Sequence, residues 1–126
     1  MIRYLIDANT AVYAMDVGHD RLKARIADCY PGEIAISAIS YAEIAYGTYI
    51  GKPPPDSVLD AFTAAIPLVP FDAAAARAYA RLPFKRARFD RLLAAHALSI
   101  GAIVVTNNTP DFTDIPGLIV ENWSVA

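Results

Sequence analysis

The stretch FDRLLAAHALSIGAIVVTNNTPDF, residues 89–112, contains the two signals that decide the fold. Its first half predicts a helix over 89–101, with Asp90 placed as a cap at its start, a row of apolar side chains on one face and Gly101 as its stop. The run AIVVT at 102–106 is continuous, apolar and β-branched, which is typical of a strand buried on both faces of a parallel sheet. A helix that leads directly into such a strand indicates an alternating α/β architecture.

The rest of the chain continues this alternation. Strands are expected at 2–6, 33–37 and 117–122, with a brief edge strand or connector at 67–71. Helices are expected through 10–14, 22–26, 57–65 and 72–82, and from a capping box made by Ser40 and Glu43 to a point between Gly47 and Gly51. The predicted fold class is therefore α/β, with three α/β/α layers around a central, mainly parallel sheet, in one domain over residues 1–126.

The composition is that of a folded domain and excludes two classes of protein. Of the 126 residues, 56% are hydrophobic and 19% are charged, which excludes a disordered tail or linker. No apolar run approaches the roughly 18–20 residues that a membrane-spanning helix needs. The first residues do not read as a secretion signal, and Cys29 has no second cysteine to pair with. We therefore expect a cytoplasmic protein with no membrane association.

The charges are nearly balanced in number but unevenly placed. With 11 Lys and Arg against 13 Asp and Glu, the net charge of -2 does not attract nucleic acid in bulk. Basic residues are nevertheless crowded at 77–91. Among them, Lys85, Arg86 and Arg88 lie beside Asp90, where they either position the phosphates of RNA or form a solvated loop.

Four acids stand where an α/β sheet carries its ligand site, beyond the carboxyl ends of strands. Asp7 follows the first strand, Glu43 lies one turn into the helix after the second, Asp90 opens the long helix, and Asp111 follows AIVVT across a short loop. Each could simply cap a helix, but together they predict one pocket of carboxylates that a divalent cation would stabilise. Oxygen ligands alone favour Mg²⁺ or Mn²⁺, and such ions suit the hydrolysis of phosphodiesters.

Three segments resemble the PIN-domain ribonucleases, particularly the VapC toxins of bacterial toxin–antitoxin pairs: LIDANT at 5–10, SYAEIAYG at 40–47 and FDRLLAAHALSIGAIVVTNNTPDFTDIPGLIVENW at 89–123. The likeness spans nearly the whole chain and is most specific from Asp90 to Trp123. It implies a PIN-like fold and a Mg²⁺- or Mn²⁺-dependent endoribonuclease. It also implies inhibition by a small VapB-like antitoxin bound over the site, and a homodimer.

Carried over position by position, the resemblance makes Asp7 and Asp90 the central metal ligands, with Glu43 and Asp111 completing the set. It implies that three polar residues hold the carboxylates and the attacking water in place: Asn9, Thr106 and Asn108.

Two features depart from the family pattern. Ala8 stands where many relatives carry a hydroxyl residue, and the connection LPFKRARF at 82–89 is short and basic. His96, on the apolar side of its helix, is expected to be structural. The alternative function is a catalytically silent PIN-like module that binds RNA or protein.

Overall fold

A computed structural model describes residues 1–83 and 89–125. Its five strands form one sheet: β1 (Tyr4–Ile6), β2 (Ile34–Ser37), β3 (Leu68–Val69), β4 (Ile103–Val105) and β5 (Val120–Glu121). Their order across the sheet is β3-β2-β1-β4-β5, and each neighbouring pair runs parallel. The strands are shorter than predicted, but each predicted strand is present, and 67–71 forms a true edge strand.

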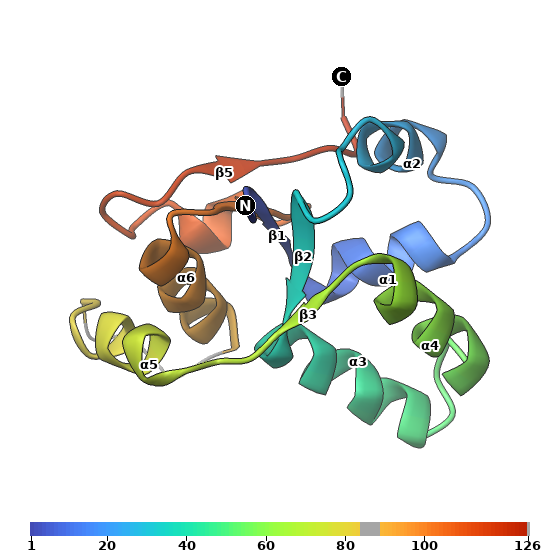
Figure 1. The fold of residues 1–126 in the computed structure, drawn as a ribbon, viewed down its shortest axis with the longest axis horizontal. Helices are drawn as coiled ribbons and strands as arrows, with labels where there is room; N and C mark the ends of the chain where they lie inside the picture. The colour runs from blue at the N-terminus through green and yellow to red at the C-terminus, as the bar shows by residue number, and fades with distance from the viewer. Residues whose placement is uncertain (84–88, 126) are drawn as a thin grey trace.

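Helices cover both faces of this sheet (Figure 1). One face carries α5 (Ala73–Ala80), α6 (Phe89–Ile100) and the 3₁₀ turn η1 (Thr109–Phe112). The other carries α1 (Ala8–Met15), α2 (Asp20–Ala27), α3 (Ala38–Tyr49) and α4 (Asp56–Ala65). The predicted three-layer α/β/α class is confirmed. None of the described helices combines the length and the apolar character that a bilayer crossing requires.

Alternation along the strands divides the core into two apolar clusters, one for each face. Tyr4 and Ile6 of β1 pack with the cluster that includes Ala11 of α1 and Leu59 of α4. Leu5 between them packs instead with residues of α6 and η1. Successive side chains of a strand point to opposite faces, so a three-residue strand serves both layers.

The start of α3 differs from the prediction. The capping box of Ser40 and Glu43 is wrong, because the helix begins at Ala38 and Ser37 caps it, accepting a hydrogen bond from the Ile39 amide at 3.0 Å. Ser40 is fully buried inside the first turn. The strand ends at Ser37, so the helix starts as soon as the last pairing of β2 is complete.

The end of α6 agrees with the prediction. Gly101 has φ +67°, a left-handed conformation that a side chain disfavours. The amide of Ala102 then donates to the carbonyl of Ala97 at 2.9 Å, and that of Gly101 to Leu98 at 3.3 Å. This pair of bonds closes the helix and turns the chain directly into β4.

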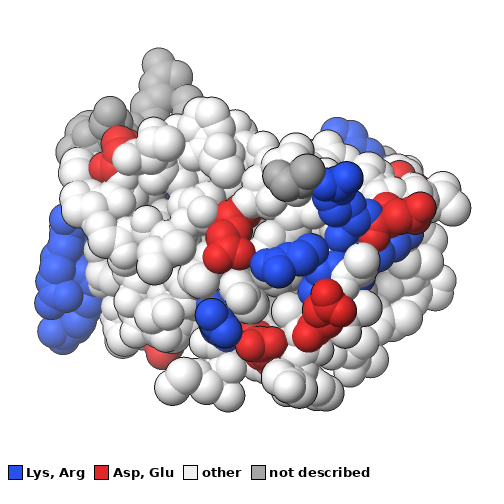
Figure 2. All heavy atoms as spheres, turned by 90° about the horizontal axis from the view of Figure 1, so that it is seen from above, with Lys and Arg blue, Asp and Glu red and all other residues white. Residues whose placement is uncertain are grey.

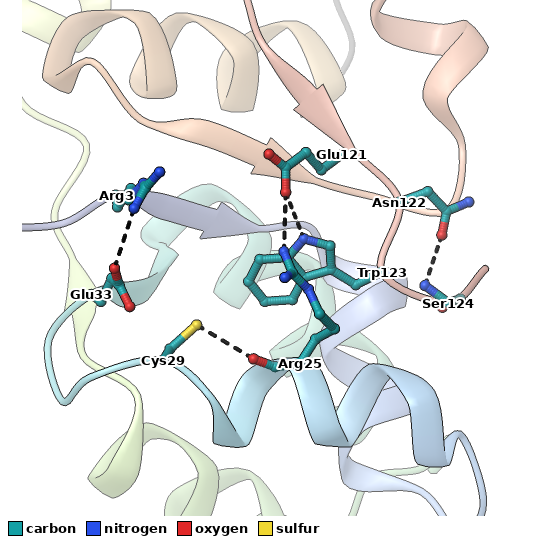
Figure 3. A network of polar contacts seen from close by, with 8 residues as sticks. All are labelled: Arg3, Arg25, Cys29, Glu33, Glu121, Asn122, Trp123 and Ser124. Carbon is teal, nitrogen blue, oxygen red and sulfur yellow. Dashed lines mark hydrogen bonds and ion pairs between the residues drawn. The ribbon is translucent and has the colours of Figure 1, made fainter. Parts of the chain in front are cut away.

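Polar contacts tie the outer elements to the sheet (Figure 3). Arg25 of α2 lies 3.3 Å from Glu121 of β5, and its guanidinium carbon is 4.6 Å from the centre of the Trp123 ring. Trp123 donates from Nε1 to the same Glu121 carboxylate at 2.8 Å. Seen from above, basic and acidic side chains lie side by side in one part of the face shown, and most of that face is uncharged (Figure 2).

Candidate active site

Two of the four predicted acids, Asp90 and Asp7, act electrostatically on a third, Glu43. The pKa of Glu43 is raised from 4.5 to about 7, chiefly by burial and in addition by the negative charges of Asp90 and Asp7. Asp7 follows β1, Glu43 lies in α3 behind β2, and Asp90 lies in the first turn of α6. Since α6 begins at Phe89, Asp90 stands inside the helix and is not the residue preceding it.

Asp7 is held on both of its carboxylate oxygens. It is only 8% exposed, its Oδ1 accepts a hydrogen bond from the Thr10 amide at 2.9 Å, and its Oδ2 accepts one from the Thr106 hydroxyl. The first contact makes Asp7 the N-cap of α1. Capping and membership of the acidic group are therefore both true of this residue, and the cap aims its carboxylate.

A chain of hydrogen bonds leads from Asp7 to the fourth acid. The hydroxyl of Thr106 accepts from the Asn108 amide at 2.9 Å, and Asn108 donates from Nδ2 to Oδ2 of Asp111. Asp111 is exposed in η1, and its charge is not among those that raise the pKa of Glu43. It therefore stands at the rim of the acidic group, linked to Asp7 through Thr106 and Asn108.

The other predicted site residues are placed less closely. Asn9 is exposed in the first turn of α1, so its supporting role stays a prediction. Lys85, Arg86 and Arg88, with most of the departing connection at 82–89, lie outside the described residues.

The donor set fits a hard divalent cation in chemistry. Asp7, Glu43 and Asp90 offer carboxylate oxygens, and the raised pKa of Glu43 measures repulsion and desolvation that a cation would relieve. Among the described residues, no group of three or more His, Cys, Asp and Glu side chains already lies in position to hold a metal ion. Asp7 and Asp90 thus influence the Glu43 carboxyl electrostatically, but the three carboxylates are not arranged as a preformed metal site.

Two side chains next to the site were read incompletely from the sequence. His96 is 1% exposed, and its Nδ1 lies 2.7 Å from the hydroxyl of Ser37, the cap of α3. It therefore joins the helix that carries Asp90 to the helix that carries Glu43. Burial lowers the pKa of His96, and the negative charge of Asp72 opposes this shift only in part.

Arg91 is the second such residue. The sequence counts it in the basic run, yet it is 8% exposed and forms an ion pair with Asp114, which follows η1. Its guanidinium is therefore part of the interior. The available signal was its position directly before the apolar Leu92 and Leu93, inside the helix.

Comparisons with known proteins show the family of the chain. A family model described as "PIN domain" matches residues 4–118. The "tRNA(fMet)-specific endonuclease VapC" of Shigella flexneri is 30% identical over 98% of this chain and 100% of its own. "Ribonuclease VapC2" of Rickettsia felis is 33% identical over 95% of this chain and 97% of its own.

Solved structures show the same fold. VapBC2 from Rickettsia felis, bound to a DNA fragment from the promoter, superposes with a TM-score of 0.83 at 32% identity, covering 98% of this chain and 99% of that one. DNA-bound VapBC from Salmonella typhimurium gives a TM-score of 0.79 at 26% identity, covering 98% and 99%.

Proposed function

The chain belongs to the PIN-domain family, and from that premise we propose that it is a metal-dependent endoribonuclease, the toxin of a VapBC-type toxin–antitoxin pair. The observation that carries the proposal is that Asp7 and Asp90 act electrostatically on Glu43, in a chain that matches VapC ribonucleases over nearly its whole length. A half-buried glutamate whose pKa is raised by burial and by two nearby carboxylates is costly for a fold, and a role in cation binding accounts for it.

Asp7 and Asp90 would be the central ligands of Mg²⁺ or Mn²⁺, and Glu43 and Asp111 would complete the set. When bound, the cation would lower the pKa of a water molecule, so that hydroxide is available to attack phosphorus, and would place positive charge near the negative charge that develops on the phosphate oxygens. Thr106 holds Asp7 in place through its hydroxyl. In the proposed reaction water attacks phosphorus and the P–O3′ bond breaks, so the products would carry a 5′ phosphate and a 3′ hydroxyl.

A covalent route has little support. Burial raises the pKa of the Cys29 thiol, and nearby Glu33 raises it further, so the thiolate needed for attack is disfavoured.

The proposed substrate is RNA, as the names of the VapC ribonuclease relatives suggest. The proposed partner is a VapB-like antitoxin, as the VapBC complexes of relatives suggest. We further propose a single PIN domain over 1–126, a homodimer in the cytoplasm, and phosphate contacts from Lys85, Arg86 and Arg88 beside Asp90. Asn9, Thr106 and Asn108 would hold the carboxylates and the attacking water in place.

The test is cleavage of a purified tRNA with Mg²⁺ or Mn²⁺, with and without EDTA. Cleavage should require one of the metals, and Asp7→Asn and Asp90→Asn should each lower the rate by orders of magnitude while the protein stays folded. Asp60→Asn, which changes an exposed acid of α4, is the matched control and should cleave normally. Cleavage that persists in EDTA would refute the metal mechanism, and binding of RNA without cleavage under any metal would favour the silent module.

A further inference from the structure

We propose that the ion pair between Arg91 and Asp114 positions the acidic site, by holding η1 with Asp111 against α6 with Asp90. The inference rests on the proposed function, since it assigns a task within that same site. Both residues are positioning residues, because neither is expected to touch RNA or the cation.

The sequence positions of the pair are the first argument. Arg91 directly follows Asp90, and Asp114 comes three residues after Asp111. Nη2 of Arg91 contacts Oδ2 of Asp114 across 23 residues of chain. One contact therefore joins the two segments that supply the third and fourth acids, Asp90 and Asp111.

The burial of the pair is the second argument. The Arg91 side chain is 9% exposed and that of Asp114 is 37% exposed, so the pair lies with its cation inside and its anion at the edge. Nη1 of Arg91 is buried and has no hydrogen-bond partner among the residues that the structure describes. A guanidinium so enclosed depends strongly on its carboxylate, because a buried charge without compensation is unfavourable.

The apolar contact beside the pair explains why an ion pair is useful there. Leu93 and Ala97 of α6 pack in one cluster with Phe112 of η1 and Ile115. Apolar contacts do not fix the relative orientation of two surfaces, whereas a planar guanidinium donates hydrogen bonds to a carboxylate in only a few orientations. The ion pair thus fixes how η1 lies on α6. The segment that carries Asp111 is therefore held through Asp114 as well as through the hydrogen bond from Asn108 to Asp111.

The experiment compares wild type with Asp114→Asn, which keeps the shape of the side chain and removes its charge. Three quantities are measured: Mn²⁺ binding by calorimetry in the absence of RNA, kcat and KM for tRNA cleavage, and unfolding of the metal-free protein. Mn²⁺ affinity and kcat should each fall by about ten- to a hundredfold, the range seen when a group that orients a metal ligand is removed. The KM for RNA should stay within about twofold, because the pair orients ligands and does not bind the substrate.

Glu33→Gln is the matched control, since it converts an acid to its amide in the Arg3–Glu33 ion pair at the amino ends of β1 and β2 (Figure 3). It should leave Mn²⁺ affinity and kcat unchanged. Arg91→Lys tests the same pair from its other side and should weaken Mn²⁺ binding as Asp114→Asn does.

A double variant separates positioning from mere stability. If the pair acts through Asp111, then Asp114→Asn should add little to Asp111→Asn in Mn²⁺ affinity or kcat. Equal loss in both backgrounds, or loss of stability with normal Mn²⁺ affinity and kcat, overturns the inference. A wild-type protein that neither binds Mn²⁺ nor cleaves RNA refutes the proposed function itself, and the positioning role falls with it.

Discussion

The raised pKa of Glu43 predicts that the metal-free protein loses stability as the pH rises. Folding moves this carboxyl from an ordinary pKa of 4.5 to about 7, so between these values the folded protein binds a proton that the unfolded chain has released. The stability that the Glu43 carboxyl contributes is therefore fully present below pH 4.5 and is lost progressively as the pH rises through about 7. Replacement by the neutral isostere, Glu43→Gln, removes this contribution.

The size of the effect follows from the shift and from the position of the side chain. One pKa unit corresponds to about 1.4 kcal/mol, so the full shift would weaken the folded state by about 3 kcal/mol at pH 8. Glu43 is only half-buried, and water screens part of the repulsion from Asp90 and Asp7. We therefore expect a loss of about 1–2 kcal/mol.

Urea unfolding of wild type and Glu43→Gln, both in EDTA, measures this loss at pH 5 and pH 8. Glu43→Gln should be more stable than wild type at pH 8 by about 1–2 kcal/mol, and the difference should shrink toward zero at pH 5. Asp60→Asn, an exposed acid on α4, should follow wild type at both values. If Glu43→Gln is less stable than wild type at pH 8, ionised Glu43 is not destabilised in the folded protein, and the proposed grouping of Glu43 with Asp7 and Asp90 is wrong.

Two further predictions concern the groups that hold the acids. Thr106→Val removes the hydroxyl that donates to Asp7, so we expect the free energy of unfolding in urea to fall by about 1–3 kcal/mol and Mn²⁺ binding to weaken in calorimetry. Thr106→Ser keeps the hydroxyl and should keep the stability and the Mn²⁺ affinity of wild type. A Val variant with normal Mn²⁺ affinity would show that the bond is only structural. Ser37→Ala should cost about 1 kcal/mol through loss of the α3 cap, and a double-mutant cycle with His96→Gln should show coupling because the two side chains share a hydrogen bond. Purely additive losses in that cycle would contradict the contact between α3 and α6.

Some features of this protein follow from short stretches of sequence. AIVVT is apolar up to Val105 and β-branched from Ile103 onward, and Gly101 before it is suited to a left-handed stop. The end of α6 and the start of β4 therefore depend on neighbouring residues alone. Asp7 after β1 is likewise determined locally, since an acid at the end of a strand caps the next helix. The alternation of such units leads to a three-layer α/β fold without knowledge of distant contacts.

Local patterns misled where two readings had equal local support. Ser37 and Ser40 are both able to cap a helix, and only the pairing of Ser37 with Val69 of the next strand decides that β2 ends and α3 begins there. Arg91 read as one more member of a basic run, because the carboxylate that draws it inside lies 23 residues further along the chain.

The sequence by itself therefore determined the layers, the transition from β1 to α1 and the transition from α6 to β4, because each depends on periodicity and on residues a turn apart. Only the tertiary structure decided which charges meet. The proton affinity of Glu43, the burial of Arg91 and the link between His96 and Ser37 depend on distances between helices that follow different strands. Electrostatic energy depends on separation in space and on exclusion of water, and neither quantity is written in the order of the residues.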